Sequence, residues 1–204
     1  MNEEFTIGIT GGIGVGKSVV SRLLRCNGFD VYDCDSEAKH LMVSDPRIKE
    51  SLISQIGEDV YYSDGSINRG KLAEILFKDH NIRNFVNKIV HQAVRDDIER
   101  RRNLIEGLFF IESAIIATAK IDKMCSQVWI IQAPLEERIN RVINRDNTDI
   151  DSIRKRMDAQ EIEFTLLKGD DTLMIENGDN TPLMLIILKL TNSINNLQTF
   201  EILC

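Results

Sequence analysis

The chain carries Gly11-Gly12-Ile13-Gly14-Val15-Gly16-Lys17-Ser18 near its start, a match to the pattern G-x-x-x-x-G-K-[ST] of a phosphate-binding loop. Glycines let successive backbone N–H groups turn inward and bind phosphate oxygens, because no Cβ atom blocks the approach. We expect Lys17 to reach the β- and γ-phosphates of a nucleotide and the Ser18 hydroxyl to ligate Mg²⁺. The loop should open a helix, whose N-terminal N–H groups and dipole favour anions.

The segments on either side of the loop have the patterns of a buried strand and a helix. Residues 5–10 alternate β-branched and small residues, as a buried strand can. After the loop, apolar residues recur at helical spacing up to Leu24, and Asn27-Gly28 is a typical helix stop. An ordinary glycine turn would require neither pattern, so the context supports the phosphate-binding interpretation.

Length, composition and charge restrict the class of protein. A chain of 204 residues with 43% hydrophobic residues suits one α/β domain with an inserted helical part. A net charge of -7 argues against a general nucleic-acid binder. The four cysteines show no C-x-x-C spacing, so neither a zinc site nor a disulfide framework is indicated. The acidic start resembles no signal peptide and no apolar run could span a bilayer, so we expect a cytoplasmic monomer or small homo-oligomer with no membrane partner.

Strand-like and helix-like segments alternate along the chain. Further strands are predicted at residues 29–33, 108–111, 128–131 and 172–176. Helices are predicted at residues 37–42, 48–56, 68–77, 82–98, 135–145, 151–164 and 181–194, with Asn68 as a cap and Pro46 as a helix start. The alternation predicts an α/β fold with a doubly wound parallel sheet. The helical stretch over residues 36–103 is too long for a simple crossover and indicates an inserted substrate-binding region.

Polar residues follow several predicted strands, at the carboxyl ends where ligands of parallel sheets bind. Asp33 is a candidate general base for deprotonating an acceptor hydroxyl, or else a cap of the following helix. Asp35 is better placed as that cap. Glu112 is either a Mg²⁺ ligand acting through water or a plain strand-end carboxylate.

Three arginines, Arg138, Arg141 and Arg145, lie on one face of the helix predicted over residues 135–145. They could neutralise phosphate charge from a closing lid. They could equally form a solvated face, partly paired through Glu137 and Arg141. His91 lies beside an apolar stripe, where a histidine is more often a core residue than a catalyst.

Taken in order, these motifs resemble those of the dephospho-CoA kinase family. The matching residues are Ile7 to Ser18, Asp33-Cys34-Asp35, Asn68-Arg69, Leu72, Phe77, His91, Phe110 to Ser113, Arg138, Arg141, Arg145 to Asn147, Arg156, Gln160 and Ile175 to Gly178. The resemblance runs from about residue 5 to residue 195. Three departures are His91-Gln92, where the family usually has His-Pro, Val19, where the family often has threonine, and Phe109 to Glu112, where aliphatic residues and often a proline are commoner.

The resemblance implies a three-layer αβα core with a parallel sheet of about five strands. It implies a nucleotide-binding core at residues 1–35, 104–134 and 166–204, a CoA-substrate-binding insertion at residues 36–103 and a lid at residues 135–165. The implied reaction uses ATP and Mg²⁺ to phosphorylate the 3′-hydroxyl of dephospho-CoA, the last step of coenzyme A synthesis.

Roles of single residues carry over from the family in the same way. Asp33 resembles the general base, and Lys17 and Arg141 resemble catalytic groups. The implied nucleotide contacts are Gly12, Ile13, Gly14, Val15, Gly16, Lys17, Ser18, Arg138, Asn177 and Gly178. The implied substrate contacts are Thr10, Asp33, Arg69, Phe77 and His91, and the implied metal ligands are Ser18 and Glu112.

Three other functions compete with this interpretation. A kinase for another small acceptor would share the same core, since spacing alone does not name the acceptor. A GTP-binding switch needs an Asp-x-x-Gly motif, which the chain lacks, and Ala119-Lys120-Ile121-Asp122 only imitates a guanine-recognition motif. A non-catalytic ATP-sensing module would have no need of Asp33 beside the loop.

Overall fold

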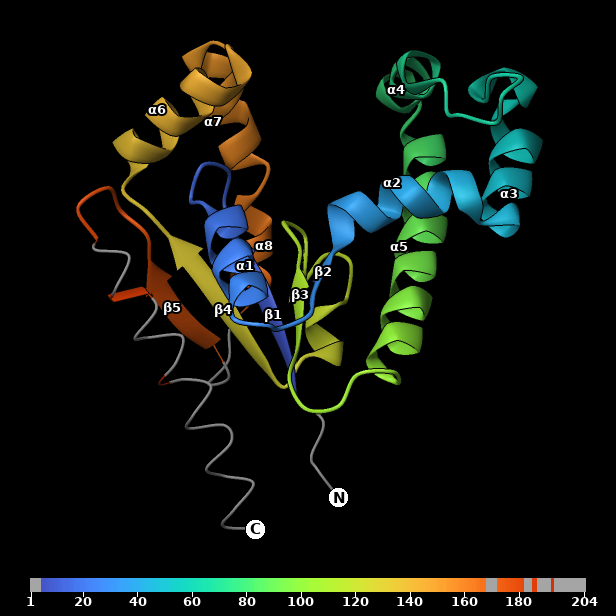
Figure 1. Ribbon diagram of the computed structural model, residues 1–204. Helices are drawn as coiled ribbons and strands as arrows, with labels where there is room; N and C mark the ends of the chain where they lie inside the picture. The colour runs from blue at the N-terminus through green and yellow to red at the C-terminus, as the bar shows by residue number, and fades with distance from the viewer. Residues whose placement is uncertain (1–4, 168–171, 182–184, 187–191, 193–204) are drawn as a thin grey trace. The chain divides into compact units, whose positions relative to one another are not determined.

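The computed structural model of the chain describes residues 5–167, 172–181, 185–186 and 192 (Figure 1). The chain divides into two compact units. One contains Met1–Tyr32 and Ile105–Cys204, and the other is the continuous segment Asp33–Leu104. None of the helices within the described part of the chain is both long and apolar enough to cross a membrane.

The first unit is built on a five-stranded sheet in the order β2-β3-β1-β4-β5. The strands are β1 (Thr6–Gly11), β2 (Val31–Asp33), β3 (Phe109–Glu112), β4 (Gln127–Gln132) and β5 (Thr172–Glu176). β1 pairs in parallel with β3 and with β4, and β4 pairs in parallel with β5. The predicted parallel sheet of about five strands is confirmed, and β1 at its centre leads directly into the glycine-rich loop.

The core of this unit explains why its strands are continuous apolar runs. Ile7, Ile9, Phe110, Trp129 and Ile131 are all buried, and they belong to one hydrophobic cluster. Strands of a parallel sheet are covered on both faces, so they do not alternate apolar and polar side chains. The loop is therefore attached to a rigid, fully packed support.

Helices of the first unit follow the strands. They are α1 (Lys17–Cys26), α6 (Leu135–Asp146), α7 (Ile150–Asp158) and α8 (Glu161–Leu166), with a short 3₁₀ turn at Asp122–Met124. The single helix predicted over residues 151–164 is wrong, because the chain breaks it at Ala159 and Gln160. There the Gln160 N–H donates to the Met157 carbonyl, a tighter turn that redirects the chain into α8. The helix predicted from residue 181 to 194 lies largely outside the described residues.

The second unit is mainly helical, with α2 (Cys34–Ser44), α3 (Pro46–Ile56), a 3₁₀ turn at Glu58–Val60, α4 (Arg69–Lys78) and α5 (His80–Arg102). A turn closed by an antiparallel bridge between Tyr61 and Ile67 precedes α4. Asn68 caps α4 by accepting the Lys71 N–H, as predicted. The expectation that Asp35 caps α2 is wrong. Asp33 is the cap, since its Oδ1 accepts the N–H groups of Asp35 and Ser36.

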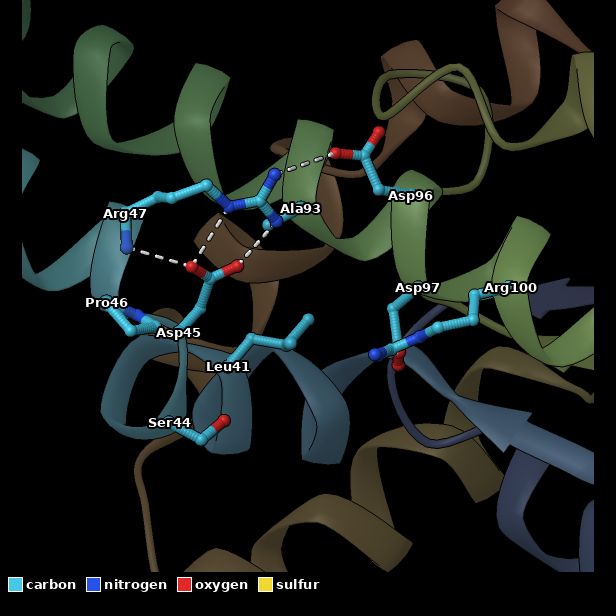
Figure 2. A pocket seen from close by; sticks show the side chains of 9 residues that line it. All are labelled: Leu41, Ser44, Asp45, Pro46, Arg47, Ala93, Asp96, Asp97 and Arg100. Atoms are coloured by element: carbon cyan, nitrogen blue, oxygen red, sulfur yellow. Dashed lines mark hydrogen bonds and ion pairs between the residues drawn. The ribbon is translucent and has the colours of Figure 1, made fainter.

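Charged side chains join the junction of α2 and α3 to the long helix α5. Figure 2 shows Arg47 bonded to Asp45 and facing Asp96, around a pocket of about 390 Å³. The side-chain hydrogen bond from Arg47 holds the pKa of Asp45 below its ordinary value. Asp97 is buried against Arg100 and Arg101. This network fixes α5 within the second unit.

Candidate active site

The glycine-rich loop has the backbone that a phosphate site requires. Gly14 and Gly16 adopt left-handed φ values of 80° and 85°, which glycine alone adopts without a steric penalty. Their N–H groups have no hydrogen-bond partner among the residues that the structure describes. Gly16 directly precedes α1, so these donors combine with the positive end of that helix. The loop offers donors for an anion.

The carbonyl groups of the loop are held by side chains. Lys17 Nζ donates to the Gly11 carbonyl at 2.8 Å, and Arg138 Nε donates to the Ile13 carbonyl at 3.0 Å. Arg141 Nη1 donates to the Gly14 carbonyl at 3.3 Å, and Asn177 Nδ2 donates to the Val15 carbonyl at 2.8 Å. Because these oxygens are engaged by donors, they are kept from turning toward a phosphate and repelling it.

Glycine is required in the loop for a second reason, the closeness of its neighbours. A Cβ on Gly14 would lie 2.5 Å from the Arg138 carbonyl oxygen. A Cβ on Gly12 would collide with the Arg138 guanidinium, and one on Gly16 would collide with the Asn177 amide. The start of α6 and the segment after β5 thus pack directly on the loop.

The three arginines of α6 differ in their partners. Arg141 forms ion pairs with Glu137 and Asp179, and Arg145 pairs with Asp146, which also binds Arg156. Arg138 is half-buried, and no carboxylate pairs with it in the part of the chain that the structure describes. Burial accordingly lowers the pKa of Arg138. A bound anion would therefore offset the desolvation cost of Arg138 more than that of Arg141 or Arg145.

Asn177 joins the segment after β5 to the loop. It is buried, and its N–H donates to the Gln132 carbonyl at the end of β4. Its own carbonyl accepts from Arg141 Nη2 at 2.9 Å. Gly178 follows, held through its N–H by the Thr181 hydroxyl. Asn177 is therefore next to the loop and Gly178 follows it in the chain, whereas contact of either residue with nucleotide stays a prediction.

Asp33 is the last residue of β2 and at the same time the cap of α2. Its second oxygen, Oδ2, accepts from the Ser36 hydroxyl at 2.9 Å. These three hydrogen bonds leave about one acceptor site, on Oδ2, since an ionised carboxylate has about four such sites. Both alternatives for Asp33 therefore remain compatible: the capping is observed, and the role of base stays a prediction.

The residues predicted to meet the metal and the reacting group lie at the ends of β1 and β3 and at the start of α1. Glu112 ends β3 and pairs in register with Ile9 of β1. Ser18 is exposed in the first turn of α1. Thr10 is fully buried, and its Oγ1 has no hydrogen-bond partner among the described residues.

The donor set at this edge of the sheet suits Mg²⁺ in a nucleotide complex. A hydroxyl and a carboxylate are oxygen ligands of the kind that the ion prefers, and phosphates and water complete its shell. The described residues hold no cluster of three or more histidine, cysteine, aspartate or glutamate side chains suited to a metal. A phosphate-bound Mg²⁺ requires no such cluster.

The substrate residues predicted in the second unit lie on two neighbouring helices. Arg69 begins α4 and is exposed, and Phe77 on the same helix is 89% exposed. His91 lies half-buried on α5. An exposed phenylalanine and arginine on one helix are chemically suited to an apolar, anionic ligand, and their contact with substrate stays a prediction.

Sequence reasoning assigned no role to Gln160 or Glu163. Gln160 Oε1 accepts the Ile13 N–H at 2.8 Å. Glu163 is buried, and its carboxylate accepts the N–H groups of Ala117 and Thr118 and the Thr118 hydroxyl. The only signal in the sequence was the presence of Gln160 among the residues that resemble the family. Both contacts join segments far apart in the chain, so no local pattern could reveal them.

Comparison with known proteins identifies the relatives of this chain. The family model described as "CoaE: Dephospho-CoA kinase" matches residues 5–181. The chain belongs to the dephospho-CoA kinase family. A dephospho-CoA kinase from Porphyromonas gingivalis is 38% identical over 197 residues, which cover 95% of each chain.

Solved structures share the fold of this chain. The Thermus thermophilus protein TT1252 is 28% identical and superposes with a TM-score of 0.78, covering 94% of this chain and 96% of its own. The dephospho-CoA kinase from Campylobacter jejuni superposes with a TM-score of 0.69, covering 95% of this chain and 98% of its own. At 20% identity, that second likeness supports the shared fold alone. As a member of this family the chain is a transferase and a kinase.

Proposed function

We propose that this chain transfers the γ-phosphoryl group of ATP to the 3′-hydroxyl of dephospho-CoA, giving coenzyme A and ADP. Family membership supports dephospho-CoA as the acceptor, and the loop supports ATP as the phosphoryl donor. The single observation that carries the proposal is the loop itself, with N–H donors of Gly14 and Gly16 available and its carbonyls held by side chains. A site preorganised in this way binds phosphate without reorganising during the reaction.

Each residue around the loop has a chemical role in this proposal. Gly12 to Ser18 bind the phosphates of ATP, and Lys17 exchanges its contact with the Gly11 carbonyl for the β- and γ-phosphates. Arg138 supplies positive charge to the transferred group, because it is half-buried beside Gly12. Asn177 and Gly178 border the nucleotide, and Arg141 holds them in place through the Asn177 carbonyl.

Asp33 is the proposed general base. It ends β2, a strand of the same sheet whose central strand leads into the loop. Its carboxylate accepts the proton of the acceptor hydroxyl as the hydroxyl oxygen bonds to the γ-phosphorus. The bond from that phosphorus to the β–γ bridging oxygen breaks, and ADP leaves with the electron pair.

Ser18 and Glu112 are the proposed ligands of Mg²⁺, Glu112 directly or through water. Bound there, the ion neutralises charge on the β- and γ-phosphate oxygens. Thr10 lies on β1 just before the loop. Its Oγ1, which has no hydrogen-bond partner among the described residues, is proposed to meet the reacting groups.

The second unit, including Arg69, Phe77 and His91, is proposed to bind dephospho-CoA. We further propose that residues 135–165 act as a lid over the nucleotide and that the enzyme works in the cytoplasm, where ATP is supplied.

The proposal is tested by measuring ADP release with a range of acceptors. Dephospho-CoA, shikimate, gluconate and nucleoside monophosphates are each offered with ATP and Mg²⁺, and release is coupled to NADH oxidation. We expect turnover with dephospho-CoA well above the rate without acceptor. Absence of turnover with dephospho-CoA would reject the proposal, and turnover with another acceptor alone would favour the competing kinase function.

A further inference from the structure

Ile13 of the phosphate loop is held in three ways by the segment from α6 to α8. Its side chain packs in a buried cluster with Val142 of α6 and Ile153 of α7, both of which are fully buried. Its carbonyl accepts from Arg138, and its N–H donates to Gln160 Oε1 at 2.8 Å. Both polar groups of this one peptide residue are thus fixed by side chains at least 125 residues away.

Gln160 is an unusual residue at its position. It occupies the N-cap of α8, where serine, threonine, aspartate and asparagine are preferred because their side chains bind the first helical N–H groups. Its side chain makes no such capping bond. It reaches instead to the loop, so a local preference is given up for a contact at the phosphate site.

The segment that carries Gln160 is itself held in place by hydrogen bonds. Its carbonyl accepts the Glu163 N–H one turn later. Glu163 is only 1% exposed, and its carboxylate is bound by the N–H groups of Ala117 and Thr118. The first turn of α8 is therefore anchored to the segment after β3, and it can hold a partner in a fixed place.

Fixing Ile13 affects the phosphate donors that follow it. Gly14 and Gly16 have left-handed φ values and lack a Cβ, so their peptide planes are free to rotate unless a neighbour restrains them. The Ile13 side chain and its two hydrogen bonds set the direction from which the chain enters Gly14. A loop restrained before the nucleotide arrives loses less conformational entropy on binding.

We propose that Gln160 is a positioning residue of the phosphate site, which acts by holding the Ile13 N–H and so preorganises the donors of Gly14 and Gly16 for ATP. The inference rests on the proposed ATP site and does not depend on the identity of the acceptor. Gln160 is expected to govern nucleotide affinity and leave the affinity for the acceptor unchanged.

The test compares Gln160→Met with Glu161→Met. Methionine at position 160 keeps the length of the side chain and removes the acceptor oxygen. Glu161 is the adjacent residue, and its exposed side chain makes no hydrogen bond within the described part of the chain, so Glu161→Met is a matched control. Gln160→Asn, which is too short to reach Ile13 and favours an N-cap, is a second variant in case the methionine protein folds poorly.

Three measurements are made on each variant: amide exchange of Ile13 by NMR without nucleotide, ATP affinity by calorimetry, and steady-state kinetics. In Gln160→Met and Gln160→Asn we expect the Ile13 amide to exchange about tenfold faster. We expect the KM and Kd for ATP to rise about fivefold to tenfold, as for the loss of one neutral hydrogen bond. We expect kcat to change less than about threefold, the KM for dephospho-CoA to stay constant, and Glu161→Met to match the wild type.

Unchanged exchange of Ile13 in both Gln160 variants would overturn the proposal, because the contact would then not restrain the loop. Faster exchange with unchanged ATP affinity would also overturn it, as would an equal effect of Glu161→Met. If the wild-type protein failed to phosphorylate dephospho-CoA, the proposed function would fail, while exchange and calorimetry would still decide the role of Gln160.

Discussion

The close packing of α6 on the phosphate loop is tested by comparing alanine at two glycines. Gly14 and Gly28 have nearly the same left-handed φ, 80° and 87°. A Cβ on Gly28 would meet nothing within 4 Å, whereas one on Gly14 would lie 2.5 Å from the Arg138 carbonyl oxygen and 2.9 Å from its Cα. The two variants share a backbone cost and differ in the clash.

The expected magnitudes follow from that geometry. An L-residue in the left-handed region costs about 1–2 kcal/mol, so both variants should lose roughly that much unfolding free energy. Relief of the clash at Gly14 requires the loop or the backbone of α6 to move by about 1 Å to reach ordinary van der Waals contact. A displacement of this size at a reacting centre lowers the rate by about 10²-fold.

The assay is kcat/KM for ATP in the coupled ADP-release reaction, with denaturant unfolding measured in parallel. We expect Gly14→Ala to lose about 10²-fold in kcat/KM and Gly28→Ala to retain the wild-type value within about twofold. Wild-type kcat/KM in a folded Gly14→Ala protein would refute the reasoning, since α6 would then not constrain the loop.

Two further outcomes are expected. Asp33→Asn should lower kcat by about 10²–10⁴-fold through loss of the base. Its melting temperature should stay close to that of the wild type, because asparagine caps helices as well as aspartate does. Turnover at the wild-type rate would mean that Asp33 is only a helix cap. Burial, with the nearby Asp122 charge, raises the pKa of the Cys125 thiol to about 12, so at pH 8 it should remain protonated. Iodoacetamide should then modify the exposed Cys26 at least about 100-fold faster than Cys125, as measured by peptide mass spectrometry. Equal rates would contradict the buried environment of the Cys125 thiol.

The fold was largely predictable because its signals are local. The loop, its flanking strand and helix, the Asn68 cap and the Pro46 helix start all depend on neighbouring residues. The strands of the central sheet were found as apolar runs for the same reason. Local patterns therefore identified the phosphate site and the order of the elements around it.

What local patterns missed depends on contacts between distant segments. The cap of α2 is a local exception: the sequence placed it at Asp35, although the Asp33 side chain accepts the N–H groups of Asp35 and Ser36. It joined α7 and α8 into one helix, because nothing nearby reveals that Gln160 and Glu163 bind Ile13 and Thr118.

The arginines of α6 show the same limit. Spacing put Arg138, Arg141 and Arg145 on one face and could not separate a phosphate-binding role from a solvated one. The structure distinguishes the three by their carboxylate partners: Arg141 and Arg145 form ion pairs, whereas Arg138 pairs with no carboxylate among the described residues. Helical periodicity cannot reveal a partner about 40 residues away, such as Asp179 for Arg141.

The central claim is that the phosphoryl group goes from ATP to the 3′-hydroxyl of dephospho-CoA. The most direct measurement is the ³¹P NMR spectrum of the product formed from purified enzyme, ATP, Mg²⁺ and dephospho-CoA, compared with authentic coenzyme A. We expect one new phosphomonoester resonance that matches the 3′-phosphate of coenzyme A, in equal amount to the ADP released. A phosphate at another position of the acceptor, or ADP released together with free inorganic phosphate, would contradict the claim.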